Sequence, residues 1–119
     1  MPERLEIQVR PGIHAPGDDV RGTVLVREGG RCRSLSVALC LYERSPGYRE
    51  AVRTERASEL HAGGLESGQR LAFKLSLPAD ASPDIDGRHG GISWAVDARW
   101  ERPGFDYLAR ARVEVAVRR

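Results

Sequence analysis

Two neighbouring segments of strictly alternating side chains constrain the fold of this chain more than any other feature. In residues 71–77 and 92–101 apolar side chains recur at every second position, and most residues between them are polar or charged. A period of two places such residues on one face of an extended strand. Both segments are therefore predicted to be half-buried strands. The inward-facing residues are Leu71, Phe73, Leu75 and Leu77 in the first and Ile92, Trp94, Val96, Ala98 and Trp100 in the second.

The same alternation predicts five further strands, in residues 4–9, 19–27, 34–43, 48–60 and 107–117. The segment that begins at Ser34 is apolar on both faces, which is typical of a central strand. Gly22 lies inside the second segment, where glycine marks a bulge or the close approach of another backbone, so we expect a bend there. Residues 78–91 are expected to form a long, polar and mobile loop.

The segment from Tyr48 to Leu60 allows two interpretations. Its Glu, Arg and Ala content suits an exposed helix, whereas the alternation of Val52, Thr54 and Arg56 suits an edge strand whose charges discourage further pairing. We favour the strand.

Turn residues separate the predicted strands about every ten to fifteen positions, as in the pairs Pro11-Gly12, Pro16-Gly17 and Gly29-Gly30. No segment has the pattern of a convincing amphipathic helix. The expected fold is therefore all-β, an immunoglobulin-like two-sheet antiparallel sandwich of about seven strands. Because 119 residues are one domain's worth of chain, we expect a single sandwich over residues 1–119.

Charge and apolar content limit the kinds of partner and the cellular location to be expected. The net charge is only +2, with 19 basic and 17 acidic residues, so no global field favours nucleic acid or an acidic membrane surface. No run of about 18 apolar residues is present for a membrane span, and the first residues lack the apolar segment of a secretory signal. The expected location is the cytoplasm, with no membrane span and no nucleic-acid partner.

The two cysteines are predicted to stay unpaired. Cys32 and Cys40 lie eight positions apart, which in an extended strand separates their Cα atoms by roughly 26 Å. A disulfide needs Cα atoms within about 7 Å, and free thiols fit a reducing compartment. Cys40 is expected to pack on a strand face with Ala38 and Tyr42, and Cys32, between two arginines, is expected to be exposed.

Several residues are candidates for a chemical site, and none is favoured. His14, His61 and His89 show no metal-ligand spacing, and default to solvated loop positions. The run from Asp84 to Gly87 resembles the start of a calcium loop, but the twelfth loop position is Ala95 where a bidentate Glu is needed. No Gly-x-Ser-x-Gly motif is present. We therefore expect no catalytic residue, no metal and no cofactor.

Three stretches resemble a known family when taken in order. Residues 16–26 (PGDDVRGTVLV) resemble the PGxxVxGxVxV motif of the N-terminal domain of arrestin-like proteins, and residues 35–39 with Tyr42-Glu43 resemble the strand that follows it. Residues 77–83 with 92–98 are similar to the family's LPxxxxPS…hxhxVxA stretch. The resemblance runs from about Leu5 to Val117 and is closest to the bacterial sporulation-control type.

The resemblance implies a β-sandwich scaffold or adaptor without catalysis. Members of the family usually pair two such sandwiches, whereas this chain holds one, and it has no Pro-Pro-x-Tyr tail. A function that depends on a groove between two domains is therefore not implied. A lone domain of such a family is also expected to self-associate.

Two functions from different classes follow. The first is a regulatory interaction module that binds a protein partner, or a second copy of itself, through an edge strand or loops. Its candidate edges are residues 5–9 and 48–60, which makes Tyr48 and Val52 candidate contacts. The alternative is a carbohydrate- or small-ligand-binding sandwich with an aromatic patch. That patch would consist of Trp100, Phe105 and Tyr107.

Overall fold

The computed structural model describes residues 4–45, 48–87 and 90–116, which form strands and loops and contain no helix. Eight strands lie in these ranges: β1 (Leu5–Val9), β2 (Asp19–Val26), β3 (Ser34–Ser45), β4 (Tyr48–His61), β5 (Arg70–Ser76), β6 (Ile85–Gly87), β7 (Gly90–Glu101) and β8 (Asp106–Val113). The fold is thus all-β, as the alternation predicts. The described residues form no helix long and apolar enough to cross a membrane.

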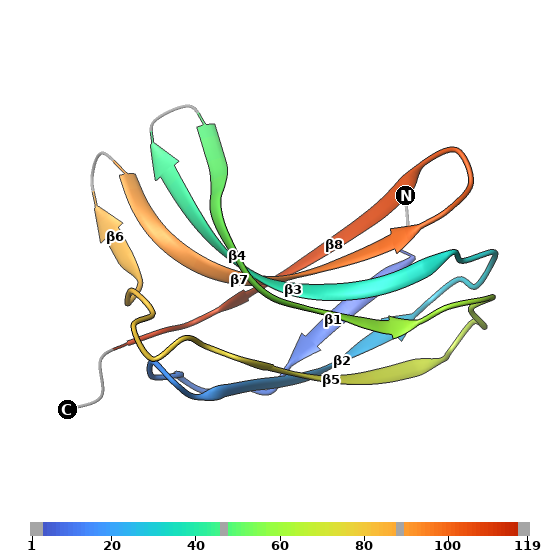
Figure 1. Ribbon diagram of the computed structural model, residues 1–119, viewed down its shortest axis with the longest axis horizontal. Coiled ribbons are helices and arrows are strands. Elements are labelled where there is room, and N and C mark those ends of the chain that lie inside the picture. The colour runs from blue at the N-terminus through green and yellow to red at the C-terminus, as the bar shows by residue number, and fades with distance from the viewer. Residues whose placement is uncertain (1–3, 46–47, 88–89, 117–119) are drawn as a thin grey trace.

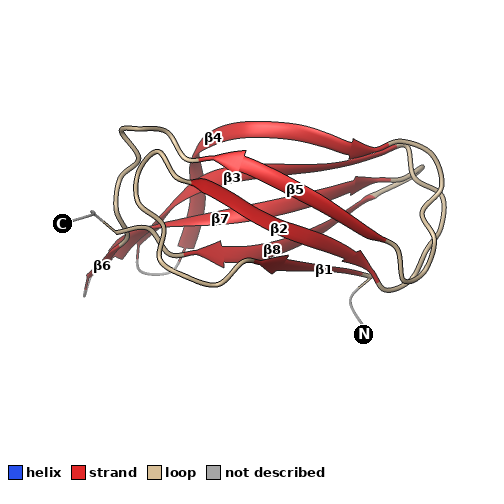
Figure 2. Ribbon diagram, turned by 90° about the horizontal axis from the view of Figure 1, so that it is seen from below, coloured by secondary structure: helices blue, strands red, loops and turns tan. Residues whose placement is uncertain are grey.

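The strands form two antiparallel sheets that pack face to face (Figure 1). The smaller sheet has the order β1-β2-β5, and the larger one has the order β4-β3-β7, with β6 and β8 pairing along the other edge of β7. Figure 2 shows β2 and β5 crossing over the strands of the larger sheet. The architecture is the predicted two-sheet antiparallel sandwich.

The core lies between the sheets and uses the predicted inward-facing residues. Trp94, Trp100, Val96 and Ala98 of β7 have no exposed surface, and Phe73 of β5 is also buried. The indole N–H of Trp94 donates to the Ser82 carbonyl oxygen at 2.8 Å, so burial leaves this polar group satisfied. The face assignment from the sequence is confirmed.

Strand β3 is central, as its two apolar faces predict. It pairs with β4 on one side and with β7 on the other. One face supplies the core, and the other holds a second buried cluster of Cys40, Tyr42 and Ala95, with Ala38 beside it. The strand interpretation of residues 48–60 is also confirmed, because β4 spans Tyr48–His61.

Residues 78–91 differ from the expected mobile loop. They contain β6, which pairs with the start of β7, and a buried Ala81. The Asp84 amide donates to the Val115 carbonyl oxygen at 2.8 Å, which ties the loop to the chain beyond β8. The last predicted strand is shorter than expected, since β8 ends at Val113 and Val115 forms an isolated parallel bridge with His14. Val117 lies outside the described residues.

The two thiols are free, as expected, but Cys32 is not exposed. It is 8% exposed and belongs to the main core, because the chain turns it inward while Arg31 and Arg33 on either side stay exposed. Burial raises the pKa of the Cys32 thiol, and the nearby carboxylates of Glu101 and Glu59 add to this effect.

Gly22 marks a close approach rather than a bulge. The β1–β2 and β2–β5 registers run through it without a shift, opposite Val9 and Phe73. A Cβ at this position would lie 2.6 Å from Cζ of Phe73 and against the Gln8 carbonyl oxygen. Only glycine leaves room for the Phe73 ring to lie across β2.

Candidate functional site

Strands β1 and β4 are edge strands, as predicted, but they differ in how far neighbouring strands cover the unpaired edge. Strand β1 lies alongside β8, and the Arg4 amide donates to the Tyr107 hydroxyl at 3.0 Å. Strand β4 pairs only with β3 among the described residues, and it also contacts β5. Figure 1 shows β3 and the first part of β4 rising together away from the smaller sheet. The first part of β4 is thus the more open edge.

The residues named for partner binding are placed differently by the structure. Tyr48 and Val52 lie on β4, but their side chains are outside the described part of the chain. Trp100 is fully buried, and its indole N–H donates to the Arg31 carbonyl oxygen at 2.8 Å, so it offers no stacking face. Tyr107 is half-buried, and only Phe105 is strongly exposed. The expected three-ring platform is wrong, because alternation along β7 turns Trp100 into the core.

Arg102 occupies the position that a stacked ligand would need. Its guanidinium carbon lies 5.1 Å from the ring centroid of Trp100 and 5.0 Å from that of Phe105. A guanidinium at these distances makes favourable cation–π contacts with both rings. The β7–β8 hairpin therefore ends in a self-contained Trp–Arg–Phe stack.

A polar network lies on the outer face of the larger sheet. The Tyr42 hydroxyl donates to Asp97, Arg110 donates to Asp97 at 2.9 Å, and the guanidinium carbon of Arg110 lies 4.1 Å from the Tyr42 ring centroid. Burial raises the pKa of Tyr42, and the carboxylate of Asp97 raises it further. The hydrogen bond that Arg110 donates to Asp97 likewise raises the pKa of Arg110. These groups satisfy one another and hold β3, β7 and β8 together.

The outer face of the smaller sheet carries a different arrangement, which we call the cationic row: Arg10, Arg21 and Lys74. The Arg10 amide donates to the Arg21 carbonyl oxygen at 2.8 Å, and Arg21 is paired with Lys74 in the β2–β5 register. All three side chains are exposed. Asp19 approaches Arg21 at 3.8 Å, and within the described ranges neither Arg10 nor Lys74 has a side-chain partner.

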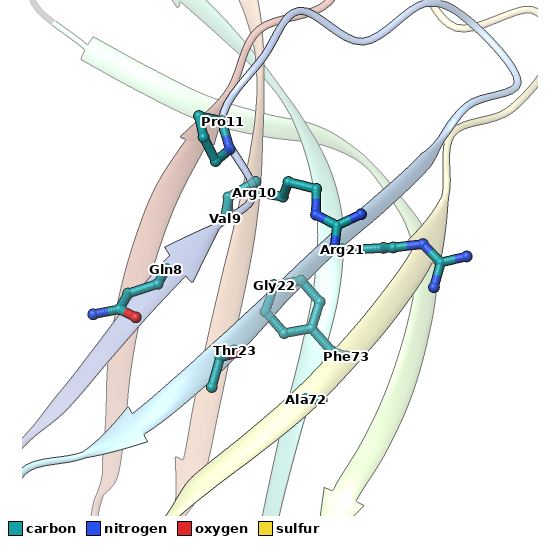
Figure 3. Close-up of a pocket in the computed structure, with 9 residues that line it drawn as sticks. All are labelled: Gln8, Val9, Arg10, Pro11, Arg21, Gly22, Thr23, Ala72 and Phe73. Carbon is teal, nitrogen blue, oxygen red and sulfur yellow. The ribbon is translucent and has the colours of Figure 1, made fainter.

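Next to the cationic row the sheet face is hollowed into a groove of about 510 Å³. The neighbouring cross-strand positions are occupied by Gln8, Thr23 and Ala72, which are shorter than the cations beside them. Figure 3 shows Arg10 reaching across β2 and Arg21 reaching toward β5. The groove is lined by Gln8, Val9, Arg10, Pro11, Arg21, Gly22, Thr23, Ala72 and Phe73.

A second groove of about 300 Å³ adjoins the first. The two share Val9, Arg10 and Pro11, the residues where the chain leaves β1. The second groove is also lined by Arg112 and by Ile13, which is 68% exposed. Together the grooves form one track that passes Arg10.

The histidines are not brought together in the described part of the chain. His14 bridges to Val115, whereas His61 contacts the Gly64 carbonyl oxygen at 2.9 Å through Nε2, and His89 lies outside the described residues. No group of three or more metal-ligating side chains is found within the described ranges.

Comparison with known proteins identifies the fold. No family model matches the chain, and no curated protein matches it by sequence. Among solved structures it is similar to Spo0M, a sporulation control protein from Bacillus subtilis, with a TM-score of 0.71 at 18% identity. The match covers 97% of this chain and 49% of the other, so this chain spans about half its length. The fold is arrestin-like.

In this arrestin-like sandwich, the grooves are the feature that sequence reasoning missed. Arg10, Arg21 and Lys74 are far apart in sequence, and no sequence motif links them. The available signal was Gly22, where the Gln8 carbonyl oxygen and the Phe73 ring occupy the space that a Cβ would need. Pairing register was needed to place the three cations in one row.

Proposed function

We propose that this chain is a non-enzymatic interaction module with a regulatory role, and that it binds a protein partner by accepting a strand along the first part of β4. The observation that carries the proposal is the position of β4 (Tyr48–His61), a long strand with one paired and one open side. An open strand edge presents unpaired N–H and C=O groups to a partner strand.

Two further observations support a binding role. The fold is shared with a sporulation control protein, which makes a regulatory role the natural proposal for this chain. A polar cluster is formed by Tyr42, Asp97 and Arg110. Its groups hydrogen-bond to one another and so serve a structural role. Phe105 is 59% exposed and is a second candidate for contact with a protein partner, in addition to the β4 edge.

Adjacent proline substitutions test strand addition. Neighbouring residues of a strand point their N–H groups to opposite sides, so one of Arg53→Pro and Thr54→Pro removes an N–H that pairs with β3 and the other removes an N–H of the open edge. Proteins captured from the native organism by each variant and by the parent chain would be compared by mass spectrometry. We expect the open-edge variant to keep its fold and lose a partner that the parent captures stoichiometrically. Retention of that partner by both variants would contradict the proposal.

A second copy of this chain is also a partner that the β4 edge can accept. Pairing of two β4 edges would continue the larger sheet across a twofold axis. Light scattering over a concentration series should then show a dimer that the open-edge proline variant lacks. A strict monomer at high concentration would leave a different protein as the partner.

A further inference from the structure

The cationic row is the least explained feature of the described surface. Like charges directly opposite each other in a sheet are destabilising, and Arg21 stands opposite Lys74 with Arg10 on the neighbouring strand. The rows on either side are arranged differently: on one side Ser76 donates to Asp19 at 2.9 Å, and on the other the positions are occupied by the uncharged Gln8, Thr23 and Ala72. The cationic row places three cations on neighbouring strands.

We propose that the cationic row and its groove bind an acidic peptide segment of a protein partner. Arg10, Arg21 and Lys74 are exposed beside a depression. Among the described side chains, Asp19 approaches Arg21 at 3.8 Å, whereas Arg10 and Lys74 have no carboxylate partner. Guanidinium groups pair with carboxylates through two parallel hydrogen bonds. The Thr23 hydroxyl and the Gln8 amide, which also line the groove, add hydrogen-bonding groups for a peptide backbone.

The size of the track favours an extended chain over a small anion. Neighbouring strands lie about 4.8 Å apart, so the row of three cations extends over about 10 Å, more than one carboxylate spans. The groove also continues past Arg10 into the second groove, where Arg112 and the exposed Ile13 lie. Ile13 suits an apolar side chain of the same peptide. Glu114 lines the second groove as well and limits the cationic track at that end.

A peptide fits better than single-stranded nucleic acid. Proteins that bind single strands without sequence preference combine basic grooves with aromatic side chains on which bases stack. Phe73 is the only Phe, Tyr or Trp among the described residues that line either groove, and it is buried in the core. His14, which lines the second groove, is half-buried. The net charge of +2 also provides little long-range attraction for a phosphate backbone.

This inference rests on the proposed function, since it names the chemistry of a protein partner, but it uses the smaller sheet and not the β4 edge. The two can therefore fail separately. Loss of acidic-peptide binding would leave the proline test at Arg53 and Thr54 unaffected.

The test is fluorescence anisotropy with a fluorescein-labelled peptide, Glu-Ser-Glu-Ser-Glu-Ser-Leu, titrated with the full chain. At about 10 mM ionic strength, where the screening length is about 30 Å, we expect saturable binding that weakens as salt is added. Arg10→Gln should weaken the affinity about fivefold, as expected for loss of one exposed ion pair. Arg70→Gln is the matched control, because Arg70 is an exposed cation on the same sheet, opposite Leu25 and outside both grooves. It should change the affinity less than about twofold.

Three outcomes would overturn the inference. They are no binding of the acidic peptide at low salt, an equal effect of Arg10→Gln and Arg70→Gln, and tighter binding of an oligo-dT strand of equal charge than of the peptide. The same peptide with Gln in place of Glu should not bind. Thermal unfolding of each variant confirms that the fold is retained, and Arg10→Lys, which keeps the charge, should restore part of the affinity.

Discussion

At the scale of single residues, the two tryptophans of β7 join the sheets without leaving a polar group unsatisfied. Trp94 and Trp100 have no exposed surface, and each donates its indole N–H to a loop carbonyl oxygen, of Ser82 and Arg31 respectively. The loops are thereby fixed to the core. A large aromatic side chain in such a site contributes both apolar burial and a specific anchor.

Truncation of Trp94 tests the burial directly. Trp94→Ala should lower the free energy of unfolding by about 3 to 5 kcal/mol, because it opens a cavity in the core. Arg99→Ala on the opposite face of β7 should leave the free energy of unfolding almost unchanged, since its pairing with Asp106 is exposed. Urea unfolding of both variants gives the comparison, and equal losses would mean that the two faces are wrongly assigned.

The Tyr42 network predicts the response to high pH. The folded state raises the pKa of Tyr42 above its ordinary value of 10.0, chiefly by burial, so folding holds this proton more tightly than the unfolded chain does. The stability from this group is complete below about pH 10 and declines as the pH rises beyond that value. Tyr42→Phe should flatten this alkaline decline in thermal unfolding measured from pH 8 to 11, a range chosen to bracket a tyrosine pKa of about 10.

Tyr107→Phe is the matched control for loss of a hydroxyl. Its hydroxyl oxygen accepts a hydrogen bond from the Arg4 amide and has no carboxylate partner among the described contacts. The alkaline decline should therefore persist in this variant. A decline of the same size in Tyr42→Phe would refute the role given to Tyr42.

Gly22 provides a third test at this scale. Gly22→Ala should lower the free energy of unfolding by about 1 to 3 kcal/mol, because the new methyl group would meet the Phe73 ring and the β1 backbone. Gly64→Ala is the control, since the nearest atom to a Cβ there is the Gly30 carbonyl oxygen at 3.8 Å. Denaturant midpoints of the two variants should differ clearly. Similar midpoints would mean that the β1 backbone and the Phe73 ring can move to accommodate a methyl group at little energetic cost.

At the scale of elements, alternation identified seven strands, and in the strands whose side chains the structure describes the inward residues pack against the opposite sheet. Strand β6 was missed because Ile85–Gly87 is too short to show a period and includes a glycine. Cys32 was misjudged because its arginine neighbours suggested exposure, whereas packing beyond β2 turns the thiol inward. Local pattern reports the phase of a strand but not how a loop between strands is packed.

The grooves could not be predicted from the sequence for a related reason. Arg10, Arg21 and Lys74 come from β1's end, β2 and β5, and only the pairing register places them side by side. Register depends on which strands meet, which a single sequence does not specify. The candidate site is therefore a product of topology, whereas the fold class is a product of local pattern.

The cationic row predicts a trade-off between stability and binding. Lys74→Glu places a carboxylate opposite Arg21 and replaces a repulsive cross-strand pair with an attractive one. It should raise the free energy of unfolding by about 0.5 to 1 kcal/mol and weaken binding of the acidic peptide at the same time. Thermal unfolding and anisotropy on one preparation measure both. A variant that is less stable, or that binds the peptide as well as the parent does, would contradict the role of the row.

At the scale of the whole molecule, each face of the sandwich carries a different feature. The interlayer holds the core, and the outer face of the larger sheet is occupied by the Tyr42 network. The outer face of the smaller sheet carries the grooves, and the first part of β4 presents an open edge (Figure 1). We propose these two separate surfaces for partner binding.

The open edge of β4 is the claim on which the proposed function depends, and amide hydrogen exchange measured residue by residue by NMR tests it most directly. In a dilute solution of the isolated chain, β3 and β7 should be protected throughout, because both sides of each are paired. In the first part of β4, protected amides that bond to β3 should alternate with amides that exchange rapidly. Uniform protection of β4 would show that its edge is already covered, and uniform rapid exchange would show that it is not a strand; either result would contradict the account.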